Sequence, residues 1–215
     1  MSDFIYKLVF NIPAFFIAVA LHEISHGWAA YYLGDNTAKK AGRLKLHTHF
    51  DFWGSFIIPL IFYIYQSPFL IGYAKPVPID PRNFKDPAAD MALVAIAGIL
   101  CNLSLAVMCA FLLKNIPNIH YLIEQFILNF IIVNLALFFF NLIPIPPLDG
   151  SRILAAVIPA TILKKYYFLE HYGFFIIVGC EMICQFVSNI TKRNISMFDT
   201  LIGKPLIATL NFLLS

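Results

Sequence analysis

The chain has 215 residues, of which 60% are hydrophobic and only 13% are charged, and its formal net charge is +3. Soluble domains carry about 25% charged residues, so this chain lacks the polar surface that a soluble fold needs. The small net charge, without any long basic run, argues against a nucleic-acid-binding protein. The composition therefore predicts an all-α integral membrane protein, a polytopic bundle of transmembrane helices.

Apolar stretches recur along the chain at the length of about 20 residues that a spanning helix needs. The expected membrane segments are, in chain order, residues 4–33, 91–113, 121–143 and 166–187. The shorter stretch 153–163 is typical of a half-helix, and the apolar tail 198–214 is expected at the membrane interface. We expect one integral-membrane domain over 1–215, with a core at 4–163 and C-terminal helices at 166–215.

Lysine and arginine are concentrated in two loops, 39–45 and 75–85, and loops of this kind usually face the cytoplasm. The apolar segment 53–74 lies between them and is interrupted by Pro59 and Pro68. Because both flanks are expected on one face, we predict a re-entrant or β-hairpin-like element near the active site, shielded by protein or by a water-filled cavity. The alternative is an ordinary span with a weak charge bias.

The first membrane segment contains the sequence H-E-x-x-H at residues 22–26. On a helix, residues four apart share a face, so His22 and His26 can hold one Zn²⁺ between them. Glu23 lies beside them, where its carboxylate can take a proton from a water at the metal. Ionisable groups deep in an apolar helix are costly and are by default functional, which argues against a chance match.

A catalytic zinc usually takes three protein ligands and leaves one position open. No later histidine or glutamate has the spacing of the usual third-ligand motifs, and Asp149 is the better candidate. It follows three prolines at the end of an apolar span, where an unpaired carboxylate is costly. The alternative for Asp149 is a helix cap at the membrane surface. His47 and His49 are possible spare ligands, but solvated loop histidines are the preferred interpretation.

The H-E-x-x-H sequence and the N-x-x-P-x-x-P-L-D-G sequence at residues 141–150 together resemble the site-2 protease family of intramembrane zinc metalloproteases, which pairs these two motifs. The segment 74–78 and Ala97-Gly98 with Asn102 are further matches. The pattern departs from the family at Ile99, where proline is usual. The resemblance extends from the first helix to about Leu154, and it indicates a short form without a PDZ or CBS domain.

The resemblance implies roles for individual residues of the two motifs. The implied zinc ligands are His22, His26 and Asp149, and the implied general base is Glu23. Asn141 and Asn102 match family asparagines near the active site, and we expect them to bind the substrate. The alternative for both asparagines is hydrogen bonding between helices, which is common for asparagine in membranes.

The activity implied by the resemblance is hydrolysis of peptide bonds in or near transmembrane segments, either to release regulators or to clear membrane peptides. The expected partners are a transmembrane protein or peptide substrate and the lipid bilayer, with the oligomeric state left open. The expected location is the cell (inner) membrane of a prokaryote, as a multi-pass protein with its active site toward the cytoplasm. Two alternatives are a membrane metal transporter or metal-binding scaffold, and an inactive protease-like chaperone.

Overall fold

The computed structural model of the chain describes residues 3–64 and 74–215, and in this part the regular structure is helical, without strands. Among the described residues, three helices are long and apolar enough to cross a membrane: α4 (Pro87–Asn115), α5 (Tyr121–Asn141) and α8 (Gly173–Thr191). The longest helix, α1 (Asp3–Tyr32), contains the H-E-x-x-H sequence. These helices confirm the predicted all-α membrane protein.

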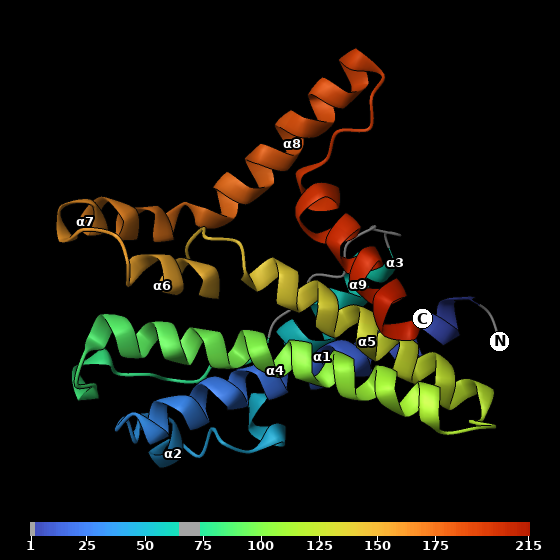
Figure 1. The fold of residues 1–215 in the computed structure, drawn as a ribbon, viewed down its shortest axis with the longest axis horizontal. Helices are drawn as coiled ribbons and strands as arrows, with labels where there is room; N and C mark the ends of the chain where they lie inside the picture. The colour runs from blue at the N-terminus through green and yellow to red at the C-terminus, as the bar shows by residue number, and fades with distance from the viewer. Residues whose placement is uncertain (1–2, 65–73) are drawn as a thin grey trace.

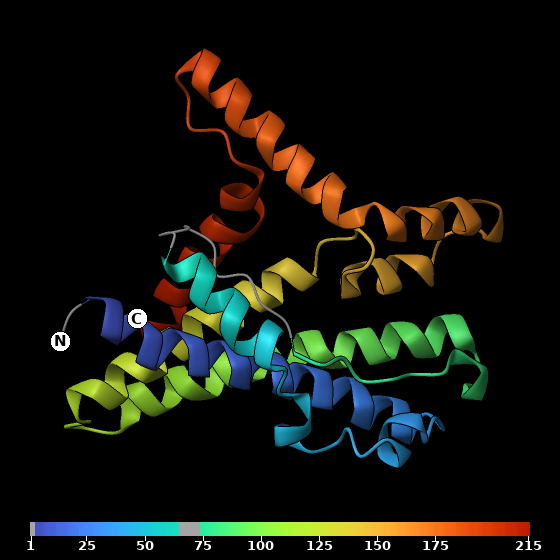
Figure 2. The same ribbon diagram turned by 180° about the vertical axis from the view of Figure 1, so that it is seen from behind.

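Helices α1, α4 and α5 lie side by side and form the body of the molecule (Figures 1 and 2). Small side chains at their contacts allow close approach of the backbones, as is usual in membrane bundles. The residues buried between α1 and α5 are Ala14, Ala18 and Phe130, and those between α4 and α5 are Ala106, Ala110, Ile131 and Leu135. This packing fixes the distance between α1 and α4, on which the site described below depends.

Helix α4 begins four residues earlier than the hydrophobic pattern alone predicts, because its first turn is capped. The side chain of Asp86 accepts hydrogen bonds from the backbone N–H groups of Ala88 and Ala89, and Pro87 occupies the first helical position. Both features favour a helix start, since the first N–H groups have no partner inside the helix. The start of α4 is therefore polar, outside its apolar stretch.

The C-terminal part consists of α6 (Asp149–Ala155), α7 (Ala160–Phe168), α8 and α9 (Lys204–Leu214). The predicted half-helix at 153–163 is thus two short helices, divided by a turn that ends at Pro159. Helix α8 projects away from the bundle (Figure 1), and the chain then returns so that leucines of α9 pack against α4 and α5. The tail expected at the membrane interface is therefore part of the bundle.

The connections between the longer helices contain short helical elements. These are α2 (Thr37–Lys40), η1 (Leu46–His49), η2 (Phe52–Ile57), α3 (Ile58–Ile64) and η3 (Pro81–Asn83), with η4 (Leu169–His171) and η5 (Asp199–Gly203) near the C-terminus. The described part of the predicted re-entrant element is thus helical and not hairpin-like. The rest of that element, 65–73, lies outside the described residues, and its re-entrant course stays a prediction.

The two flanks of this element meet at His49. The backbone N–H of Lys75 donates to the carbonyl of His49 at 2.9 Å, and Nδ1 of His49 lies 2.9 Å from the carbonyl of Lys75. Nε2 of the same ring lies 2.8 Å from the carbonyl of Arg43. His49 is fully buried, so its interpretation as a solvated loop histidine is wrong. Its ring joins the two basic loops and leaves no nitrogen for a metal.

Candidate metal centre

Two side-chain atoms of α1 and one from the distant residue Asp149 converge inside the helix bundle. Nε2 of His22 and Nε2 of His26 are 2.9 Å apart, and Oδ2 of Asp149 lies 3.0 Å from the first and 3.3 Å from the second. Tetrahedral zinc with bonds of about 2.0–2.2 Å separates its ligand atoms by about 3.3–3.6 Å. The three atoms therefore need only a small outward shift to surround one ion.

The Nδ1 atoms of the two rings, which face away from the centre, fix the orientation of the rings. Nδ1 of His22 donates to Oδ1 of Asn102 at 2.6 Å, and Nδ1 of His26 donates to the carbonyl of Val94 at 2.8 Å. Because each Nδ1 carries the proton, each neutral ring presents an Nε2 lone pair to the centre. Oδ2 of Asp149 is also buried there and has no hydrogen-bond donor. Three electron-rich atoms without a donor fit a cation.

The C-terminal part of the chain holds the loop that carries Asp149. The hydroxyl of Tyr166 donates to the carbonyl of Pro144 at 3.0 Å, and Arg152 of α6 forms an ion pair with Glu170. The first residue of α8 is a glycine, Gly173, at which any Cβ would collide with the loop backbone. These contacts from α7, η4 and α8 position the carboxylate whose Oδ2 has no hydrogen-bond donor.

Glu23 is next to the two histidines and is held from the opposite side. A carboxylate oxygen of Glu23 lies within 4.8 Å of ligand nitrogens of both rings, and Oε2 accepts a hydrogen bond from the backbone N–H of Val77 at 2.9 Å. Prolines on either side of Val77 have no N–H to offer. Gly27 lies against the same segment, because a Cβ there would lie 3.3 Å from Cγ1 of Val77.

The sequence comparison decides the family. The model of peptidase family M50 matches residues 10–180, most of the chain. The chain belongs to the M50, or site-2 protease, family. A protein of Bacillus subtilis (strain 168) named "Putative zinc metalloprotease YwhC" is 35% identical over 190 residues, which cover 82% of this chain and 83% of that protein. No solved structure matches the chain. Membership of the M50 family identifies a zinc metallopeptidase fold in an integral membrane protein.

The two asparagines singled out in the sequence occupy different positions in this M50 protein. Asn102 is fully buried and uses both ends of its amide inside the protein, toward His22 and toward Asn134. That position corresponds to the alternative role, hydrogen bonding between helices. Asn141 is half-buried at the end of α5, where its amide donates to the carbonyl of Leu137. A substrate-binding role for either residue stays a prediction.

The sequence interpretation gave no role to Asn134, Gly98 or Val77, each of which the structure places against His22, His26 or Glu23 or one hydrogen bond away from them. Asn134 lies in the middle of an apolar span, and a buried amide in such a place is itself a signal of a required partner. Gly98 was noticed as part of a motif but was given no role. Val77 contributes a backbone N–H, which no side-chain pattern reveals.

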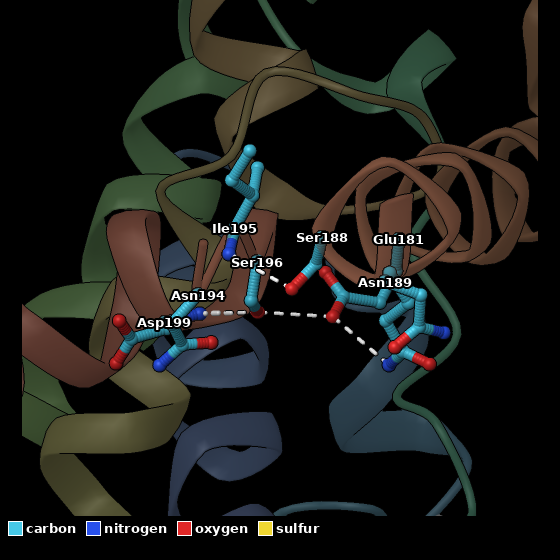
Figure 3. A pocket seen from close by; sticks show the side chains of 8 residues that line it. Glu181, Ser188, Asn189, Asn194, Ile195, Ser196 and Asp199 are labelled. Atoms are coloured by element: carbon cyan, nitrogen blue, oxygen red, sulfur yellow. Dashed lines mark hydrogen bonds between the residues drawn. The ribbon is translucent and has the colours of Figure 1, made fainter. Parts of the chain in front are cut away.

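A second polar cluster lies along the C-terminal half of α8, around Glu181 (Figure 3). The carboxylate of Glu181 accepts hydrogen bonds from the backbone N–H groups of Met197 and Phe198 and from the side chains of Ser196 and Gln185. Four donors satisfy this buried carboxylate, so it has no need of an ion. It caps the helical turn that leads into α9. The candidate metal site is therefore the one formed by α1, α4 and α6.

Proposed function

We propose that the chain is an intramembrane zinc endopeptidase that cleaves peptide bonds in or near transmembrane segments of membrane proteins. The observation that carries the proposal is the convergence of His22, His26 and Asp149 on one point, with Glu23 beside it, within a bundle of apolar helices. Its M50 membership supports the zinc chemistry, and the apolar helices support a membrane-embedded substrate.

His22, His26 and Asp149 would hold the Zn²⁺, which when bound lowers the pKa of water and polarises a scissile carbonyl. Glu23 is the general base, and it takes the proton of the attacking water and passes it to the leaving amine nitrogen. The N–H of Val77 donates to Oε2 of Glu23, and the carboxylate keeps further lone pairs that can receive the proton. This hydrogen bond also keeps the carboxylate turned toward the histidines.

A transmembrane substrate hides its carbonyls in helical hydrogen bonds, so it must unwind locally before cleavage. The loop 142–148 between α5 and α6 is not helical and carries Asp149 at its end. We propose that this loop offers backbone groups to the unwound strand, as in strand addition. Asn141, at the entry to the loop, is the candidate for a side-chain contact with the same strand.

The proposed location is the cell membrane of a prokaryote, with the site toward the cytoplasm. The C-terminal end of α1 leads into the basic loop 39–45, and the second basic loop is joined to it through His49. Loops of this composition face the cytoplasm. The M50 relative in Bacillus subtilis fits a bacterial membrane.

The test is cleavage of single-span membrane proteins by the purified chain in liposomes, together with its zinc content. Glu23→Gln keeps the shape of the side chain and the oxygen that Val77 bonds, but it cannot take a proton. We expect one zinc per chain and a loss of cleavage of at least about 100-fold, the usual contribution of a general base. Glu124→Gln, at an exposed position in the first turn of α5, is the matched control and should cleave normally.

Turnover of Glu23→Gln at nearly the wild-type rate would remove Glu23 from the mechanism. Zinc binding by the wild type without cleavage of any single-span substrate would favour the metal-binding scaffold or the inactive chaperone. Zinc transport into liposomes that survives in Glu23→Gln would favour the transporter.

A further inference from the structure

A series of hydrogen bonds through three buried side chains leads from the metal centre on α1, across α4, to α5. His22 of α1 donates to Asn102 of α4, and Nδ2 of Asn102 donates to Oδ1 of Asn134 of α5 at 3.0 Å. Nδ2 of Asn134 in turn donates to the carbonyl of Phe130 at 2.8 Å. Both asparagines are fully buried and His22 is 6% exposed, so water does not replace these partners.

The direction of these hydrogen bonds is fixed at the carbonyl of Phe130. The carbonyl of Phe130 can only accept, so the amide of Asn134 must turn its nitrogen toward it and its oxygen toward Asn102. Asn102 then turns its nitrogen to Asn134 and its oxygen to His22. A ring that faces this oxygen must carry its proton on Nδ1, which leaves the lone pair of Nε2 directed at the centre.

The opposite orientation of the Asn102 amide competes with this one. If the amide of Asn102 were reversed, its N–H would face Nδ1 of His22, and the proton of the ring would move to Nε2. That proton would lie 3.0 Å from Oδ2 of Asp149, a good hydrogen-bond distance. The site would then satisfy itself without a metal, and Nε2 would be blocked as a ligand.

We propose that Asn134 is a positioning residue of the metal centre: acting through Asn102, it selects the His22 tautomer whose Nε2 lone pair faces the ion. The inference rests on the metal site of the proposed function, although not on the peptidase activity. Partners beyond the direct ligands commonly change metal affinity by about 10–100-fold, because they fix the tautomer and the orientation of a ligand ring.

The experiment compares zinc affinity in four purified variants, measured by competition with a chelator. Asn134→Leu removes the amide and keeps a similar volume, Asn102→Leu removes the intermediate, and the third variant combines both. Asn129→Leu is the control, because Asn129 lies on the same helix and makes the same kind of bond, from Nδ2 to the carbonyl of Gln125. The ¹⁵N signals of the histidine rings in metal-free protein report the tautomer of His22 directly.

We expect Asn134→Leu to weaken zinc binding by about tenfold or more, within the range for such partners, and to shift the His22 signals away from the Nδ1–H form. In the Asn102→Leu background the same change should have no further effect, since the residue through which Asn134 acts is gone. Asn129→Leu should bind zinc within about twofold of the wild type, because its bond does not reach a ligand.

Wild-type zinc affinity and an unchanged tautomer in Asn134→Leu would overturn the inference, as would an equal further loss in the Asn102→Leu background. If the leucine variant does not fold, Asn134→Ala and Asn134→Asp take its place; the second keeps an acceptor for Asn102 and should restore most of the affinity. A wild-type chain that binds zinc but cleaves nothing would count against the proposed function alone.

Discussion

Gly98 of α4 lies directly against the imidazole of His26. A Cβ added at Gly98 would lie 2.6 Å from Nε2 of His26 and 2.8 Å from Cε1 of His22, closer than real Cβ atoms approach other atoms. One turn earlier on the same face of α4, the carbonyl of Val94 accepts the hydrogen bond from Nδ1 of His26. The helix therefore both holds the ring and leaves just enough room for it.

Gly98→Ala is expected to displace the two rings and weaken zinc binding by more than about tenfold, as loss of ligand orientation does elsewhere. Peptidase activity should fall with zinc occupancy. The measurement is zinc affinity by chelator competition, with helical content followed by circular dichroism.

Gly179→Ala on α8 is the matched control for this change. Nothing lies within 4 Å of a Cβ at Gly179, so that variant should bind zinc normally. Wild-type zinc affinity in Gly98→Ala would show that the rings tolerate the displacement, and the steric argument would fail.

Asp149→Asn tests the carboxylate that lacks a donor. An amide binds zinc poorly, whereas its N–H can donate to Nε2 of His22, now 3.0 Å from the oxygen. The variant should lose the thermal stabilisation that zinc gives the wild type, which amounts to about 2.7 kcal/mol at a free zinc concentration of 100 times Kd. Its metal-free form should be at least as stable as that of the wild type, because the buried Oδ2 that lacks a donor is gone.

The measurement is thermal unfolding in detergent, with added zinc and with chelator. If zinc raised the unfolding temperature of Asp149→Asn as much as that of the wild type, Asp149 would be excluded as a ligand.

The sequence singled out the three side chains that converge in the structure because each motif is local. A spacing of four places His22 and His26 on one helix face, and a proline-broken helix end exposes Asp149 without a partner. The contributions of Gly98 and Asn134 depend on how α1, α4 and α5 are rotated against one another. The spacing of residues within one helix does not reveal that rotation, so the roles of these residues could be recognised only in the structure.

His49 shows why the loops were harder to predict than the helices. A histidine between basic residues is usually solvated, and nothing in its neighbours along the chain indicates otherwise. Its burial depends on carbonyls from Arg43 and Lys75, which lie on either side of the long apolar segment. Contacts of this kind are set by loop geometry, which hydrophobic patterning does not encode.

Asp35, just after α1, ties the two basic loops together and makes their stability depend on pH. It is fully buried and accepts hydrogen bonds from the backbone N–H and hydroxyl of Thr37, the N–H of Asp80 and the amide of Asn83. Burial raises the pKa of Asp35, but these hydrogen bonds outweigh it and bring the pKa below its ordinary value of 3.8. The charged form therefore stabilises the fold above about pH 4, and this contribution is lost as the pH falls through the lowered pKa.

Asp35→Asn leaves at least one of these donors without an acceptor and should destabilise the chain by about 1–3 kcal/mol at neutral pH. The difference from the wild type should shrink below about pH 4, where the wild-type carboxylate begins to lose its charge. Urea unfolding in detergent at several pH values measures this difference. A difference in the free energy of unfolding that stays constant down to about pH 2 would contradict the role of the charge.

The apolar segment between the basic loops is expected to enter and leave the membrane on one side. The hydrogen bonds between His49 and Lys75 bring its two flanks together, as expected of a segment that begins and ends on one face. Both flanks carry the positive charge typical of cytoplasmic loops. If the segment is re-entrant, we expect it to lie beside the helix that carries His22 and His26 and to serve as a gate or as an edge that pairs with the substrate strand.

Single cysteines at Lys40 and Lys85, in a background without the four native cysteines, measure this directly through labelling with a membrane-impermeant reagent. Both side chains are exposed, so both should react when the cytoplasmic face is accessible and neither from outside. A third cysteine at Asn115, at the opposite end of the spanning helix α4, should react only from outside and establishes that the membranes are sealed and oriented. Labelling of Lys40 and Lys85 from opposite sides would mean that the segment spans the bilayer. It could not then act as a gate that opens and closes from the cytoplasmic face, and the contact between His49 and Lys75 would have to be absent in the membrane.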